Sequence, residues 1–180
     1  MLKILMLSGV ALAAATTADA RPAAFRVTVD GTVHGRFQAG QYANAFGCSG
    51  GNVSPRIVWS GEPAGTKSFV VTVYDPDAPT GSGWWHWVVK DIPASAHELA
   101  KGTTDGNLPR GAVQVTGDAG VAGYTGPCPP QGEDHHYIVT VWALKTDRLN
   151  VPPNASPAMV GFATHMAQIG QARTVIRAAR

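Results

Sequence analysis

Charged side chains are scarce in this 180-residue chain, where Asp, Glu, Lys and Arg together make up 14% of the sequence. The net charge of +2 is small and evenly distributed, which argues against a nucleic-acid-binding surface. Turn-forming residues, in contrast, are abundant, with 21 Gly and 13 Pro. Low charge with many turn formers favours one β-rich domain with long loops over a helical bundle.

A hydrophobic run long enough to span a membrane is also lacking. The apolar run Ile4–Ala15 is too short for a comfortable span. It follows the positive charge of Lys3 and precedes Ala18-Asp19-Ala20, which has the small-x-small form of a cleavage site. We therefore predict that residues 1–20 are a removed secretory signal, that residues 21–180 are one mature domain, and that the protein is periplasmic or secreted. A retained membrane anchor is the alternative.

Cysteine is nearly absent. The chain has only Cys48 and Cys128, which lie in Gly-rich and Pro-rich stretches. In an oxidising compartment we expect these two residues to form a disulfide, while two free thiols or a reactive Cys128 are the alternatives. Two cysteines so far apart do not have the paired spacing of a zinc site.

The most informative stretch is Ser68–Pro93, in which two apolar runs, Phe69–Tyr74 and Trp84–Val89, flank a loop of Asp, Pro, Gly, Thr and Ser. Such runs are typical of strands, and their nearly continuous apolar character predicts central strands that are covered on both faces. Regular alternation along the second strand would place Trp84, His86 and Val88 on one face of the sheet. It would place Trp85, Trp87 and Val89 on the opposite face.

Polar groups gather at one end of this pair of strands. Asp75 and Asp77 follow the first strand, and His86 lies inside the second. A buried imidazole must be paired or functional, because unsatisfied buried polar groups are costly. The alternative is that Asp75–Pro79 forms only a turn and that His86 is a satisfied core residue.

The other expected elements follow from local patterns. Strands are predicted at Phe25–Val29, near Arg36–Phe37, and at Arg56–Ser60, Ala112–Val115, Asp134–Leu144 and Ala172–Ile176. Ala94–Ala100 has helix-forming residues with Ser95 as a candidate cap, and the rest of Lys101–Gly126 is expected to be a long loop. On the strand Asp134–Leu144, alternation separates His135 and Tyr137 from His136, so only one of the two histidines can face a pocket together with Tyr137.

A helix is predicted over Asn154–Ile169, with Ser156 as N-cap, Pro157 at the first position and Gly170 as its stop. Its apolar residues at three- and four-residue spacing predict one buried stripe that packs on a sheet: Met159, Phe162, Ala163, Met166 and Ile169.

Four motifs in order resemble the phosphatidylethanolamine-binding protein family, which includes the Raf kinase inhibitor proteins. The motifs are Tyr74-Asp-Pro-Asp-Ala-Pro79, Gly83-Trp-Trp-His-Trp87, Gly126-Pro-Cys-Pro-Pro130 and His135-x-Tyr137. The signal peptide and the loop Gly47–Pro55 before a Trp-bearing strand resemble the secreted bacterial branch of that family. The resemblance covers about Phe25 to Arg180. Where the family motif usually has Arg after its His, this chain has His136.

The resemblance implies a mainly β fold in which two antiparallel sheets pack as a sandwich with a C-terminal helix and a small anion pocket. Carried over position by position, it implies a ligand-binding set with no cofactor: Asp75, Asp77, Pro79, Trp84, His86, Gly126, Pro127, His135 and Tyr137. It also implies docking to or inhibition of a partner protein, such as a protease or a kinase, although an exported protein does not meet a cytosolic kinase. A homodimer is an alternative that the sequence leaves open.

Three functions fit these residues. The first is a non-enzymatic binding protein for a small anionic or zwitterionic phosphorylated group, such as phosphate or phosphoethanolamine, because histidine cations and a Gly N–H can hold an anion. The second is a hydrolase that uses Asp75, His86 and His135 as acid and base groups. The absence of a Gly-x-Ser-x-Gly motif argues against that reading. The third is a metal site of the same three residues, whose spacing matches no recognised metal motif.

Overall fold

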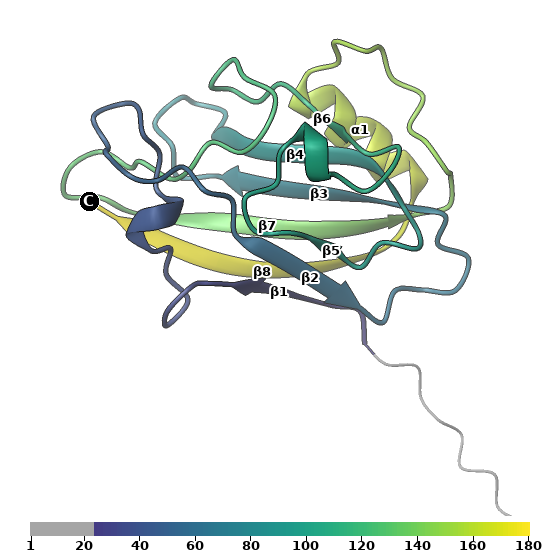
Figure 1. Cartoon of the computed structure of the whole chain (residues 1–180). Coiled ribbons are helices and arrows are strands. Elements are labelled where there is room, and N and C mark those ends of the chain that lie inside the picture. Colours follow the sequence, from purple (N-terminus) through teal and green to yellow (C-terminus); the bar gives the residue numbers. More distant parts are fainter. Residues whose placement is uncertain (1–23) are drawn as a thin grey trace, which may run out of the picture.

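Two antiparallel β-sheets and one α-helix form the three layers of the computed structural model, which describes residues 24–180 (Figure 1). The predicted signal sequence, residues 1–20, lies outside the described residues. Within residues 24–180, no helix is both long and apolar enough to cross a membrane.

The smaller sheet has three strands in the order β1-β2-β5, and the larger has five in the order β6-β4-β3-β7-β8. The strands of the small sheet are β1 Arg26–Asp30, β2 Arg56–Ser60 and β5 Glu98–Leu99. Those of the large sheet are β3 Ser68–Asp75, β4 Trp84–Pro93, β6 Val113–Gln114, β7 Asp134–Leu144 and β8 Gln168–Ala179. The helices are α1 Pro157–Ala167 and the short 3₁₀ turns η1 Ala39–Gln41 and η2 Asp105–Asn107. The predicted β-sandwich with a C-terminal helix is confirmed.

The large sheet is buried on both faces. One face packs against the small sheet through residues such as Phe69, Val71 and Trp59. The other face packs under α1 through Val70 and Val88. Strand β3 is the middle strand, and its nearly continuous apolar sequence is explained by this double coverage, as predicted.

Regular alternation on β4 is broken at His86, so the predicted assignment of its faces is wrong. Val73 pairs with Trp87 while Tyr74 pairs with Trp85, which leaves His86 as an extra residue opposite β3. A bulge of this kind places two consecutive side chains on the same side. Trp87 lies in the core between the sheets, and the His86 ring packs 5.0 Å from the ring of Tyr137 on that same side.

The predicted helix exists, but it buries a different face. Ser156 caps it by accepting the Met159 N–H, and Pro157 starts it, as expected. The buried residues, however, are Pro157, Val160, Thr164 and Ala167. The predicted apolar stripe is exposed at Met159, Phe162, Met166 and Ile169, with Phe162 at 70%. Gly161 leaves room toward the sheet, since a Cβ there would meet the Trp85 ring only at 4.0 Å, an ordinary contact distance.

The prediction that Gly170 ends the helix is wrong. Strand β8 begins at Gln168, directly after α1, and runs to Ala179, well beyond the predicted Ala172–Ile176. Gly170 pairs with Ala143 inside the sheet, where a Cβ would approach Pro63 Cγ to 2.6 Å. Close packing therefore explains this glycine.

Two weaker predictions also fail. The segment Ala94–Ala100 forms no helix, and its end pairs with β2 as strand β5. The segment near Arg36 forms isolated bridges to Val33 and Arg177 in place of a strand. The segment Ala94–Ala100 is too short for helix propensity to outweigh the pairing that β2 offers.

Cys48 and Cys128 form a disulfide with a Cα–Cα distance of 6.0 Å, as predicted. It joins the loop after η1 to the loop before β7. Both loops lie at the end of the large sheet where β3 stops and β7 begins, the left end in Figure 1.

The helix packing predicts effects of very different size for two nearby residues of α1. Val160→Ala removes fully buried methyl groups and is expected to lower the free energy of unfolding by about 2 kcal/mol. Phe162→Ala is expected to change it by less than about 0.5 kcal/mol, because the ring is exposed. Chemical denaturation measures both, and a large loss at Phe162 with none at Val160 would mean that the helix packs by the stripe predicted from sequence.

Candidate functional site

A cavity of about 240 Å³ opens at the end of the large sheet where β3 ends and β7 begins. Most of the residues predicted to bind a ligand line it: Asp75, Pro79, Trp84, His86, Gly126, His135 and Tyr137. Asp77 and Pro127 do not. The chain thus brings Asp75, His86 and His135 together from three strands.

Asp75 is the acid at the floor of this cavity. It is the last residue of β3, and its side chain is only 3% exposed. Its Oδ2 lies 2.7 Å from His135 Nδ1, and its Oδ1 accepts the Asp77 N–H at 2.8 Å. The Tyr137 hydroxyl also lies near this carboxylate. These hydrogen bonds compensate for the burial of a charged group.

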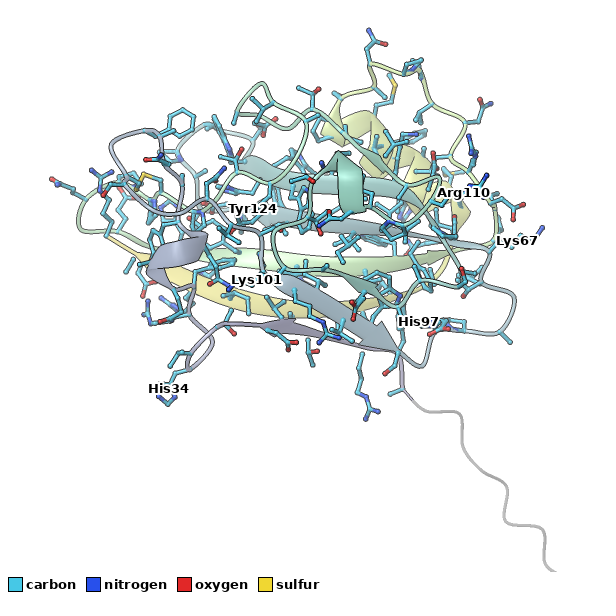
Figure 2. The ribbon with its side chains drawn as sticks, viewed as in Figure 1. His34, Lys67, His97, Lys101, Arg110 and Tyr124 are labelled. Carbon is cyan, nitrogen blue, oxygen red and sulfur yellow. A yellow bond between two sulfur atoms is a disulfide. The ribbon has the colours of Figure 1, made fainter. Side chains whose placement is uncertain are left out.

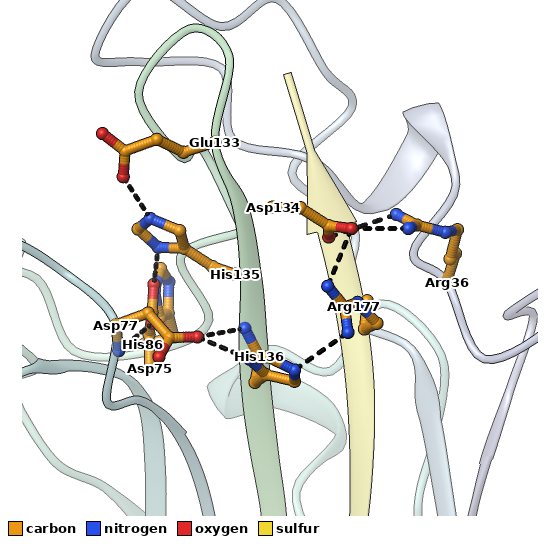
Figure 3. A network of polar contacts seen from close by, with 9 residues as sticks. All are labelled: Arg36, Asp75, Asp77, His86, Glu133, Asp134, His135, His136 and Arg177. Carbon is orange, nitrogen blue, oxygen red and sulfur yellow. Dashed lines mark hydrogen bonds and ion pairs between the residues drawn. The ribbon is translucent and has the colours of Figure 1, made fainter.

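His135 is a buried cation between two acids (Figure 3). Besides the bond to Asp75, its Nε2 lies 2.8 Å from Glu133 Oε2. Carboxylate oxygens accept hydrogen bonds, so both ring nitrogens of His135 donate and the ring is an imidazolium. Burial alone would lower the pKa of His135, but the bonds to Glu133 and Asp75 together raise it above the ordinary value of 6.5.

His86 is the neutral counterpart of His135. Its Nδ1 lies 2.9 Å from the Thr125 carbonyl oxygen, which can only accept, so the proton is on Nδ1. Burial lowers the pKa of His86 below 6.5, and the nearby Thr125 carbonyl and Asp75 only partly offset this. The bare Nε2 then faces Asp75 Oδ2 at 4.0 Å, too far for a hydrogen bond.

Tyr137 lines the cavity beside His86. Its ring packs edge-on against His86 at 5.0 Å and against Phe37 at 5.4 Å. Burial raises the pKa of its hydroxyl, and the neighbouring Asp75 charge adds to that effect. The phenol therefore stays protonated and can act as a hydrogen-bond donor.

Asp77 belongs to a polar network outside the cavity (Figure 3). Its Oδ2 accepts the backbone N–H of His136 at 2.7 Å and lies 2.8 Å from the His136 ring, and the backbone bond is the main cause of its lowered pKa. Arg177 bridges His136 to Asp134, whose pKa falls to about 2 because it also binds Arg36. His136 therefore points away from His135, as strand alternation predicts.

The N–H of Gly126, which the sequence suggests as a hydrogen-bond donor to an anion, is already bonded within the protein. It donates to Asn52 Oδ1 at 2.8 Å, and the Pro127 carbonyl accepts the Ala43 N–H at 3.1 Å. Both residues thus hold the loop in place. Sequence reasoning missed Asn52, because its partner lies 74 residues away and no local pattern indicates the pairing.

The mouth of the cavity is apolar, which sequence reasoning also missed. Phe46 is 62% exposed and packs edge-on against Trp84, with ring centroids 6.0 Å apart. Cys128, Pro129 and Pro130 complete this side. The available signal was the position of Phe46 two residues before Cys48, since the disulfide draws that loop to the cavity.

Among residues 24–180, no group of three or more His, Cys, Asp or Glu side chains is arranged to hold a metal ion.

Comparisons with known proteins agree on one family. Residues 33–178 match the family described as phosphatidylethanolamine-binding protein. The chain is 51% identical to UPF0098 protein YbcL of Escherichia coli over 87% of its own length and 88% of that protein. It is 40% identical to LppC of Mycobacterium tuberculosis, which is named as a lipoprotein, over 72% of its length and 62% of that protein.

Solved structures are similar over most of the chain. The crystal structure of YbcL, described as a new member of the mammalian PEBP family, superimposes with a TM-score of 0.83 at 47% identity, covering 88% of this chain and 99% of that one. CT736 of Chlamydia trachomatis, described as a homologue of phosphatidylethanolamine-binding protein, superimposes with a TM-score of 0.72 at 28% identity. The covered shares are 87% of this chain and 98% of that one.

The two histidines are expected to titrate on opposite sides of pH 6.5. NMR spectra of the imidazole carbons, assigned with His86→Gln and His135→Gln, should show His135 titrating above pH 6.5 and His86 below it. Because the pKa of His135 is raised on folding, the stability it contributes is complete below pH 6.5 and is lost as the pH rises through the folded-state pKa. The reverse order of titration would contradict the assigned protonation states.

A second prediction concerns the loop that carries Gly126. A Cβ at this position would lie 2.1 Å from the Gln41 carbonyl oxygen, a backbone atom that cannot move aside. Gly126→Ala is therefore expected to lower the free energy of unfolding by about 3 kcal/mol or more. Gly161→Ala is the control: it meets only the Trp85 ring at 4.0 Å and should stabilise α1 by about 0.5–1 kcal/mol. Equal effects in thermal unfolding would contradict this description of the loop.

Proposed function

The chain belongs to the phosphatidylethanolamine-binding protein family, and we propose that it binds a small phosphorylated group that brings its own proton donor. Phosphoethanolamine and a monoprotonated phosphate monoester are ligands of this kind. The observation that carries the proposal is the pair of acceptors at the cavity floor, His86 Nε2 and Asp75 Oδ2, which face each other at 4.0 Å. A ligand ammonium could donate one N–H to each of these acceptors, and a P–OH group could donate its single proton to one of them.

The donors in the cavity wall support the same choice, because most are already engaged. The Nδ1–H of His86 is bound to Thr125, both N–H groups of His135 are bound to carboxylates, and the Gly126 N–H is bound to Asn52. A bare dianion would therefore meet few free donors and two carboxylates, Asp75 and Glu133. A ligand that carries both a positive and a negative charge avoids this repulsion.

The negative end of the ligand is expected to lie near His135. Its imidazolium is the buried positive charge of the cavity, and the apolar walls formed by Trp84, Tyr137 and Pro79 strengthen its attraction for an anion by excluding water. Phe46 and Trp84 at the mouth leave room for an apolar or alkyl portion of the ligand.

We propose binding without chemical conversion. A hydrolase of the serine or cysteine type needs a nucleophile that is hydrogen-bonded to a histidine. Within residues 24–180, the partners of the His86 and His135 rings are the Thr125 carbonyl and carboxylates, and no hydroxyl or thiol is among them. This arrangement favours a binding site over a catalytic one.

We also propose that the protein is exported and that its signal sequence is removed after residue 20. The sequence pattern of residues 1–20 and the disulfide between Cys48 and Cys128 support this location. The name of the mycobacterial relative, a lipoprotein, is consistent with an exported family branch.

Titration calorimetry tests the binding proposal directly. At pH 7 phosphoethanolamine should give a saturable signal, and His86→Ala should lower its affinity by about tenfold or more, because a hydrogen bond to a charged group is lost. His97→Ala is the matched control. His97 lies at the opposite end of the molecule from the disulfide and is half exposed (Figure 2).

The proposal would be wrong if phosphoethanolamine gave no binding signal with the wild-type protein, or if His86→Ala and His97→Ala bound it equally well. Release of inorganic phosphate from the ligand, abolished by His86→Ala, would instead support the hydrolase.

A further inference from the structure

Glu133 is a second acid at His135 that the motifs did not single out. His135 donates to Asp75 through Nδ1 at 2.7 Å and to Glu133 through Nε2 at 2.8 Å (Figure 3). The imidazolium at the site therefore has no free N–H. A phosphoryl oxygen can bond to this ring only if one of the two carboxylates moves away.

The two carboxylates differ in how firmly they are held. The Asp75 side chain is 3% exposed and accepts a further bond from the Asp77 N–H. The Glu133 side chain is 49% exposed, and within residues 24–180 its carboxylate bonds only to His135. A half-exposed carboxylate with one partner contributes little free energy and is easily displaced.

The backbone of Glu133 is fixed while its side chain is not. Its N–H donates to the Pro130 carbonyl at 3.2 Å, closing a turn in which Gly132 has a φ of 84°. Its carbonyl accepts the Arg180 N–H at 3.2 Å. Glu133 precedes His135 by two residues, so both side chains extend to the same face of the chain. The turn thus places a carboxylate that can move next to Nε2 of His135, the ring nitrogen that is not bonded to Asp75.

We propose that Glu133 is a built-in competitor for the ligand, occupying at His135 Nε2 the position that a phosphoryl oxygen takes in the complex. A ligand binds by displacing this carboxylate, which stays nearby and repels a ligand more strongly the larger the net negative charge of that ligand. Glu133 therefore selects zwitterionic phosphorylated groups over simple anions. This inference rests on the proposed function of the same cavity.

The test is titration calorimetry of Glu133→Gln with two probes, inorganic phosphate and phosphoethanolamine. Glutamine keeps the size of the side chain and removes its charge. Phosphate should bind the variant about two- to fivefold more tightly than the wild-type protein, the range expected for one exposed ion pair. Phosphoethanolamine should gain less, so the preference for it over phosphate should fall.

Asp147→Asn is the matched control, because it changes the net charge by the same amount. Asp147 is exposed and follows the far end of the 11-residue strand β7, on the order of 30 Å from Glu133. This control should leave both affinities unchanged. A gain for phosphate in Asp147→Asn as large as in Glu133→Gln would overturn the inference, since the effect would be one of overall charge.

The remaining outcomes separate the two claims. If the wild-type protein binds phosphoethanolamine but Glu133→Gln binds phosphate no better, Glu133 is not a competitor and the proposed function stands. If phosphate binds only to Glu133→Gln, the inference is supported in its strongest form. If neither protein binds either probe, the proposed function fails and the inference fails with it.

Discussion

The hydrogen bond between Asp75 and His135 is the interaction on which the rest of the site depends. It joins the last residue of β3 to the start of β7, across the end of the large sheet. Asp75 is buried, so its charge requires a positive partner, and His135 supplies it by remaining protonated. Two imidazolium rings in one small cavity would repel each other. Burial favours the neutral form of His86, whose Nδ1–H donates to a backbone carbonyl.

Because His135 is charged and His86 is neutral, the residues of the cavity have different roles in the proposed binding. In the proposed function, His135 attracts the negative part of the ligand, while His86 Nε2 and Asp75 Oδ2 accept hydrogen bonds from its positive part. In the inferred competition, Glu133 occupies His135 Nε2 until a ligand displaces it. The apolar walls strengthen each of these interactions because little water competes inside the cavity. A group with both an anionic and a proton-donating part fits this arrangement better than a simple anion.

Sequence patterns predicted the parts of the fold that depend on local periodicity. The bounds of β2 and β7 followed from alternation and β-branched residues, and the cap of α1 followed from Ser156. The buried face of α1 did not, because apolar residues occur around most of the helix and only the sheet decides which of them it covers. The bulge at His86 depends on pairing with β3, and the hydrogen bond from Gly126 to Asn52 crosses 74 residues, so neither leaves a local signal. The contact between Glu133 and His135 could have been predicted from the sequence, since residues two apart in an extended chain place their side chains on the same side.

The most direct test of this account is to locate the protons on the two histidines by neutron diffraction at pH 7. The account predicts hydrogen on both ring nitrogens of His135 and on Nδ1 alone of His86, with the Nε2 of His86 bare. Hydrogen on Nε2 of His86 together with a singly protonated His135 would contradict it, because the buried positive charge would then be on the wrong ring and the cavity would have no acceptor pair for a ligand to satisfy.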